Sequence, residues 1–114
     1  MVDCIFCKIV AKEIPSQIVY EDDSIMAFND INPVAPIHVL VIPKKHILNI
    51  NYLTEQDEQV IGKIFSTIKT IAAEMGVGDT GFRVVSNSGS DGGQEVDHLH
   101  FHLIGGKALG KKIG

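Results

Sequence analysis

Apolar residues near the start of the chain recur at the three-to-four-residue spacing of a helix. Within CIFCKIVAKEIP these residues are Ile5, Phe6, Ile9 and Val10. The pattern predicts a short amphipathic helix in a segment that ends at Pro15. Cys4 and Cys7 fall on its first turn.

The next segments have the pattern of strands. QIVYEDDSIMAFND holds two β-favouring runs around the polar cluster Glu21-Asp22-Asp23, which predicts a hairpin. The prolines of INPVAP then disfavour helix. IHVLVIP is an apolar run that Pro43 stops, so we expect a buried strand with His38 near its start.

A longer helix is predicted after this strand. Thr54 is its expected N-cap, Asp57 is the capping-box partner three residues later, and Gly76 suits the left-handed stop position. Its apolar stripe faces the core and consists of Val60, Ile61, Ile64, Phe65, Ile68, Ile71, Ala72 and Met75.

The remaining chain adds two predicted strands, GFRVVSN and EVDHLHFHLI, on either side of the glycine-rich loop SGSDGGQ. Residues 107–114 have the composition of a flexible tail. Residues 1–114 are therefore predicted to form a single α+β domain, in which one long and one short helix pack on an antiparallel sheet.

Composition excludes several classes of function. The chain has 114 residues, of which 45% are hydrophobic, and a net charge of −4, which disfavours nucleic-acid binding. Its longest apolar run, Ile37–Ile42, is far shorter than the roughly 20 residues of a membrane span. There is no signal-peptide pattern, so we expect a cytoplasmic protein in which Cys4 and Cys7 stay reduced.

Three histidines occupy alternate positions of the last predicted strand. His98, His100 and His102 should share one face, while the apolar residues between them pack on the core. Three neutral imidazoles and a water can hold zinc. The adjacent glycine-rich loop favours phosphate chemistry instead, because its backbone amides can approach an anion. Imidazole can attack phosphorus directly and can transfer protons near neutral pH.

The segment HLHFHLI resembles the signature of the histidine triad (HIT) superfamily of nucleotide hydrolases and transferases. The resemblance extends to the Hint branch through IFCKIVAKEIP, YEDDSIMAFNDINPVAPIHVLVIPKKHI and FRVVSNSGSDGGQEV. It implies a dimeric HIT-like fold and hydrolysis of the P–N bond in purine nucleoside phosphoramidates. No cofactor would be needed for catalysis, since histidine itself is the nucleophile.

The resemblance also implies a role for individual residues. His100 is similar to the nucleophile, His102 and His38 to its phosphate and proton partners, His98 to a residue that orients it, and Asp30 to the ribose ligand. The implied base pocket consists of Phe6, Ile9, Phe28 and Ile31. The implied phosphate side consists of Asn87, Gly93, Gln94 and Glu95.

Two positions depart from the family pattern. Glu95 stands where relatives often have serine, and Asp97 stands where they have an aromatic residue. Two other functions remain open: a nucleotide-binding sensor or interaction module with vestigial hydrolysis, and a dinucleoside polyphosphate hydrolase of the Fhit type. The double glycine after the triad is Hint-like and disfavours the latter.

The pair Cys4 and Cys7 has the spacing of half a tetrahedral zinc site. We expect a structural zinc with His46 and His98 as the further ligands, as in the bacterial members that the chain resembles. The alternative is a reduced, partly buried cysteine pair without a ligand.

Overall fold

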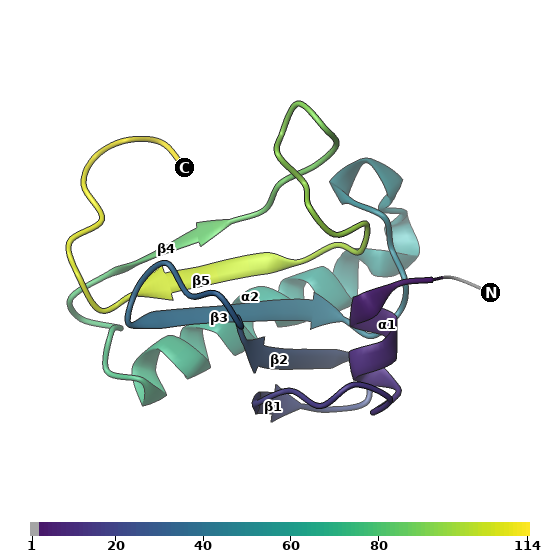
Figure 1. The fold of residues 1–114 in the computed structure, drawn as a ribbon, viewed down its shortest axis with the longest axis horizontal. Coiled ribbons are helices and arrows are strands. Elements are labelled where there is room, and N and C mark those ends of the chain that lie inside the picture. The colour runs from purple at the N-terminus through teal and green to yellow at the C-terminus, as the bar shows by residue number, and fades with distance from the viewer. Residues whose placement is uncertain (1–2) are drawn as a thin grey trace.

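The computed structural model describes residues 3–114. Its five strands form one antiparallel sheet in the order β1-β2-β3-β5-β4, as Figure 1 shows. The predicted α+β class is confirmed. The strands are β1 (Ile18–Glu21), β2 (Ile25–Asn29), β3 (Ile37–Pro43), β4 (Phe82–Val85) and β5 (Phe101–Gly105).

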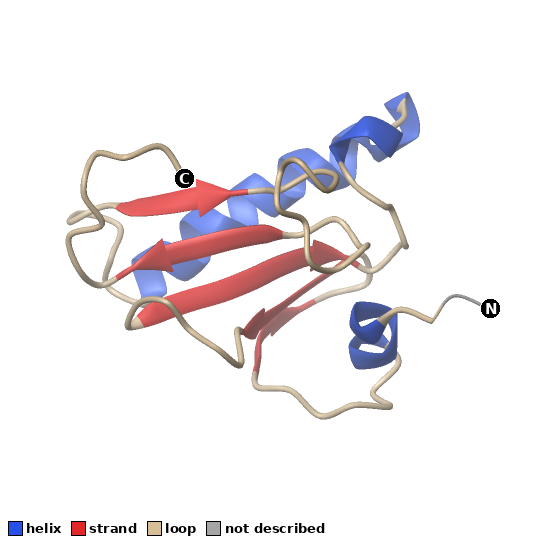
Figure 2. Ribbon diagram, turned by 45° about the horizontal axis from the view of Figure 1, so that its top comes forward, coloured by secondary structure: helices blue, strands red, loops and turns tan. Residues whose placement is uncertain are grey.

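The long helix α2 (Glu58–Glu74) covers one face of the sheet (Figure 2). Its buried Ile64, Ile68 and Ile71 share a core cluster with strand residues such as Val39 and Val41. A short 3₁₀ turn over Ile50–Tyr52 precedes the helix, and a second one over Glu55–Asp57 leads into it. The Asp57 carboxylate accepts hydrogen bonds from the Thr54 amide and hydroxyl at 2.9 and 3.1 Å, so the predicted capping pair is confirmed. Thr54 caps the 3₁₀ turn, however, and Asp57 is the N-cap of α2 itself.

The short helix α1 (Ile5–Val10) lies over the opposite face. Phe6 and Ile9 pack with Met26, Phe28 and Leu40, which alternate along their strands with the residues under α2. The helix ends well before Pro15, and Lys12 adopts a positive φ of 64°. The turn after Val10, rather than the proline, therefore ends the helix.

Two further expectations about elements need correction. The last strand begins only at Phe101, because residues 96–98 form a bend in which the His98 amide bonds to the Val96 carbonyl. In the α2 stripe, Phe65 is 49% exposed. Thr67 is buried instead, because its hydroxyl donates to the Lys63 carbonyl within the helix.

The C-terminal segment has a contact with the sheet. Arg83 on β4 donates a hydrogen bond of 2.8 Å to the Gly110 carbonyl. Within residues 3–114, no helix has the length and apolarity required to cross a membrane.

Candidate active site

Histidines from two neighbouring strands lie together on the α1 face of the sheet. His102 on β5 is directly opposite Leu40 on β3, and His38 is two residues away on that strand. Leu99, the residue before His100, belongs to the core under α2. The predicted separation of an apolar face and an imidazole face is therefore confirmed, although His98 and His100 precede the regular strand.

His100 is held in one tautomer. Its Nδ1 lies 2.6 Å from the backbone carbonyl oxygen of His98, so this nitrogen carries the proton and donates it. The opposite nitrogen, Nε2, then has a free lone pair. Since His100 lines the main cavity, a nucleophilic atom is available there without prior removal of a proton.

His38 and His102 form a second ordered pair. The Val34 amide donates to His38 Nδ1 at 3.1 Å, which places the His38 proton on Nε2. That nitrogen lies 2.9 Å from His102 Nδ1 and donates to it, so His102 keeps its own proton on Nε2. Burial, followed by the charges of His100 and His38, lowers the pKa of His102 to about 4.

Asp30 completes this group but does not turn it into a metal site. Its Oδ2 lies 3.4 Å from His38 Nε2, and ligand atoms of Asp30, His38 and His102 lie within 4.8 Å of one another. A metal needs an unprotonated nitrogen, whereas the Val34 hydrogen bond keeps the proton on His38 Nε2. The donor set therefore fits a hydrogen-bond relay better than a metal.

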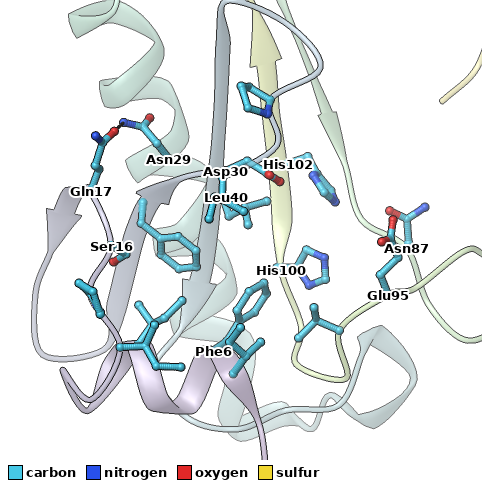
Figure 3. Close-up of a pocket in the computed structure, with 18 of the residues that line it drawn as sticks. Phe6, Ser16, Gln17, Asn29, Asp30, Leu40, Asn87, Glu95, His100 and His102 are labelled. Atoms are coloured by element: carbon cyan, nitrogen blue, oxygen red, sulfur yellow. Dashed lines mark hydrogen bonds between the residues drawn. The ribbon is translucent and has the colours of Figure 1, made fainter.

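A cavity of about 750 Å³ opens over these histidines. Figure 3 shows His100 and His102 between an apolar region around Phe6 and Leu40 and a polar end with Asn87 and Glu95. The predicted site residues that line it are Phe6, Ile9, Phe28, Asp30, Ile31, Asn87, Gly93, Glu95, His100 and His102. His38, His98 and Gln94 are not among the lining residues.

Gln94 has a different position from the one expected. Its side chain accepts from the Gly89 amide and donates to the carbonyls of Leu48 and Val96 at 2.9, 2.7 and 3.0 Å. It thus fixes the glycine-rich loop from inside. At Gly92 a Cβ atom would lie 2.4 Å from the Ser88 carbonyl oxygen, so this loop conformation requires glycine there.

His98 is fully buried and its ring turns away from the cavity toward the two cysteines. Its Nε2 donates to the Pro43 carbonyl at 2.8 Å, which leaves Nδ1 unprotonated. That atom lies 3.5 Å from the Sγ of Cys4 and of Cys7, and Cys7 Sγ lies 3.2 Å from His46 Nδ1.

This cluster has the dimensions of a zinc site. Ligands about 2.0–2.3 Å from a tetrahedral zinc are about 3.3–3.8 Å apart, close to the separations between these atoms. Without a cation, burial and the neighbouring Cys4 raise the pKa of the Cys7 thiol to about 11. A bound divalent cation would reverse that preference and favour the thiolate. The residues therefore fit the metal.

Comparison with known proteins assigns the family. A model described as the HIT domain matches residues 11–109. The chain belongs to the HIT domain family. It is 44% identical over 111 residues to the purine nucleoside phosphoramidase of Escherichia coli K12, covering 97% of this chain and 93% of the relative.

Further HIT proteins are similar over nearly the whole chain. An uncharacterized HIT-like protein of Synechocystis sp. is 49% identical over 105 residues, covering 92% of this chain and 91% of the relative. The structure of a histidine triad protein from Clostridium difficile has a TM-score of 0.94 at 52% identity, covering 99% of this chain and 98% of that one. The family and the HIT-like fold inferred from the sequence are thereby confirmed.

The HIT cavity includes residues that the sequence analysis did not identify. Leu40 lies between the base wall and His102, and the strand alternation from His38 would have placed it on this face. Ser16, Gln17 and Asn29 line the far end of the cavity. No periodic signal marks Ser16 and Gln17, since they lie in the irregular segment between α1 and β1.

Proposed function

We propose that this HIT family hydrolase cleaves the P–N bond of purine nucleoside phosphoramidates through a nucleotidyl-His100 intermediate. The observation that carries the proposal is the His100 ring, whose Nδ1 donates to the His98 carbonyl and whose Nε2 is free toward the cavity. The 44% identity to the phosphoramidase of E. coli K12 supports the same substrate class.

The layout of the cavity supports a nucleotide as the bound group. The rings of Phe6 and Phe28 pack edge to face, with their centroids 5.4 Å apart. They offer an apolar wall for a planar base. A carboxylate such as Asp30 suits the ribose hydroxyls and would repel a phosphate. The phosphorus would then lie near His100 and His102.

The reaction would proceed in two displacements. His100 Nε2 forms a bond to phosphorus as the P–N bond breaks. The electron pair of the P–N bond leaves with the amine nitrogen. The negative phosphate favours uptake of one proton by the His38–His102 pair, and the Nε2 proton of His102 is then transferred to that nitrogen. Water then attacks the phosphorus of the nucleotidyl-His100 and gives a proton to His102. The bond between phosphorus and His100 breaks in this step, and the nucleoside monophosphate is released.

Replacement of the nucleophile tests the proposal. His100→Ala should lower turnover of an AMP-amide by at least about a thousandfold while AMP still binds, because covalent catalysis is lost. Acid-quenched wild-type protein should carry a nucleotide mass on the His100 peptide. Turnover by the variant within tenfold of wild type would contradict the assignment, and AMP binding without turnover by the wild type would favour the binding module.

We also propose a structural zinc held by Cys4, Cys7, His46 and His98, supported by the separations between their ligand atoms. The ion would fix the cluster and the His98 ring. The chemical steps would remain with the other histidines.

A homodimer is the remaining proposal. Phe65 and Phe82 are 49% and 39% exposed, and a domain of this size often gains stability by association. Sedimentation equilibrium should give twice the chain mass at micromolar concentration. A single-chain mass there would contradict a stable dimer.

A further inference from the structure

Glu95 has a position that the proposed reaction leaves unexplained. Its side chain lines the main cavity together with His100 and His102, and it also lines a neighbouring cavity of about 590 Å³. Among the described residues, no lysine or arginine lines the main cavity, and neither forms an ion pair with Glu95. A carboxylate without a cationic partner among the described residues thus lies beside His100 and His102.

The order of groups along the cavity indicates which part of the substrate meets Glu95. Figure 3 shows Glu95 and Asn87 on the opposite side of His100 and His102 from Ser16 and Gln17, at the far end of the base pocket. A nucleotide that extends from the base pocket to the histidines ends there at its phosphorus. In the proposed reaction, the group beyond the phosphorus, toward Glu95, would be the leaving amine.

Asn87 adds a second acceptor at this end. Its Nδ2 donates to the Gly92 carbonyl at 2.7 Å, which assigns the amide orientation and leaves Oδ1 free to accept. Two acceptors beside an anionic phosphate are unfavourable unless a donor or a cation lies between them. An amine with an additional positive charge supplies both.

The neighbouring cavity is negatively charged, like the Glu95 end of the main cavity. It is lined by Asp3, Lys8, Glu95 and Asp97 among others, and Lys8 Nζ is paired with Asp3 Oδ1 at 3.1 Å. The carboxylates of Glu95 and Asp97 therefore remain as its net charge. A leaving group that extends past Glu95 would meet acidic side chains.

We propose that Glu95 makes this enzyme select phosphoramidates whose leaving amine carries a second, positively charged group, such as a diamine or a basic amino acid. This inference rests on the proposed function. Glu95 acts by charge on specificity and takes no part in bond cleavage. An exposed ion pair of this kind corresponds to a preference of about 1.4-fold to fivefold.

The test uses three AMP-amides with leaving amines of equal length that end in an ammonium, a methyl or a carboxylate group. For the wild type, kcat/KM should decrease in that order. The ammonium-to-methyl ratio should approach one for Glu95→Gln, and also for the wild type in about 1 M salt, where the Debye length is about 3 Å. Asp91→Asn removes the same charge from an exposed residue of the same loop that lines neither cavity, and should keep the ratio.

The outcomes separate the two proposals. Turnover of all three amides with a ratio that neither Glu95→Gln nor salt reduces would overturn the role of Glu95 alone. A wild-type preference for the methyl or carboxylate amide would do the same. If the wild type cleaves none of the three, the phosphoramidate activity fails and this inference fails with it.

Discussion

His98 contacts two functional groups through different atoms. Its ring Nδ1 faces the thiols of Cys4 and Cys7, whereas its backbone carbonyl accepts the proton of His100 Nδ1. The contact that fixes the nucleophile tautomer is thus made by the main chain. A metal in the cysteine cluster would hold this backbone in place without touching the reacting atoms.

Asp30 should determine the preference for ribonucleotides. Loss of a charged hydrogen bond costs about 1.5–3 kcal/mol, so Asp30→Ala should weaken AMP binding roughly ten- to a hundredfold and affect 2′-deoxy-AMP less. Calorimetry of both nucleotides measures the difference. Asp30 Oδ1 also accepts from the Asn32 amide at 2.8 Å, and Asp30→Asn keeps an acceptor there. If Asp30→Ala weakens the binding of AMP and of 2′-deoxy-AMP equally, Asp30 serves only the hydrogen bond with the Asn32 amide.

At the scale of elements, the sequence predicted which way residues face better than where elements begin. The period of two around His100 placed Leu99 under α2 correctly, even though β5 begins later at Phe101. The Leu99 amide bonds to the Ile47 carbonyl at 2.6 Å, which keeps this segment extended without a strand partner. Such a long-range contact has no signature in the local pattern.

In the candidate site, too, the sequence predicted which residues take part but not the long-range contacts that orient them. Motif spacing selected the triad histidines and the cysteine pair, whereas the family resemblance selected Asp30 and His38. The structure places these residues in two clusters. The inward turn of Gln94 depends on contacts with the Leu48 carbonyl and Gly89 amide, and the His38 tautomer depends on Val34. These partners are main-chain groups, and any residue type could supply them.

The cysteine cluster joins α1 to the end of β3 and the bend before β5, so its metal should stabilise how these elements pack. Protein purified without chelator should contain about one zinc per chain. Cys4→Ser combined with Cys7→Ser should lose it and lower Tm by about 5–10 °C, since a ligand that binds only the folded state stabilises by a few kcal/mol. Some hydrolysis should remain.

Elemental analysis and thermal unfolding, with and without chelator, measure both effects. Chelator should lower the Tm of the wild type and leave that of the double variant unchanged. Substoichiometric metal in the wild type, or equal metal content in both proteins, would contradict the site.

At the scale of the whole molecule, the sheet separates two cores with different functions. The larger core under α2 holds the strands together, and the smaller core under α1 forms a wall of the cavity. Several histidines are buried at the boundary of the smaller core. Burial lowers the pKa of His98 and of His102 to about 4, so protonation of either ring opposes folding.

His102 should make the folded state sensitive to mild acid. Its pKa is lowered to about 4 from 6.5, mainly by burial. Between these two pH values the unfolded chain therefore binds a proton at His102 that the folded chain does not bind. The resulting stability is fully present above pH 6.5 and is lost as the pH falls toward 4. Between pH 7 and pH 5 this amounts to about 2 kcal/mol. In His102→Gln the side-chain oxygen can still accept from His38. Between pH 7 and pH 5 the free energy of unfolding of this variant should therefore decrease by about 2 kcal/mol less than that of the wild type. Urea unfolding of both proteins at the two pH values measures the difference, and parallel losses would show that His102 takes up its proton equally in both states.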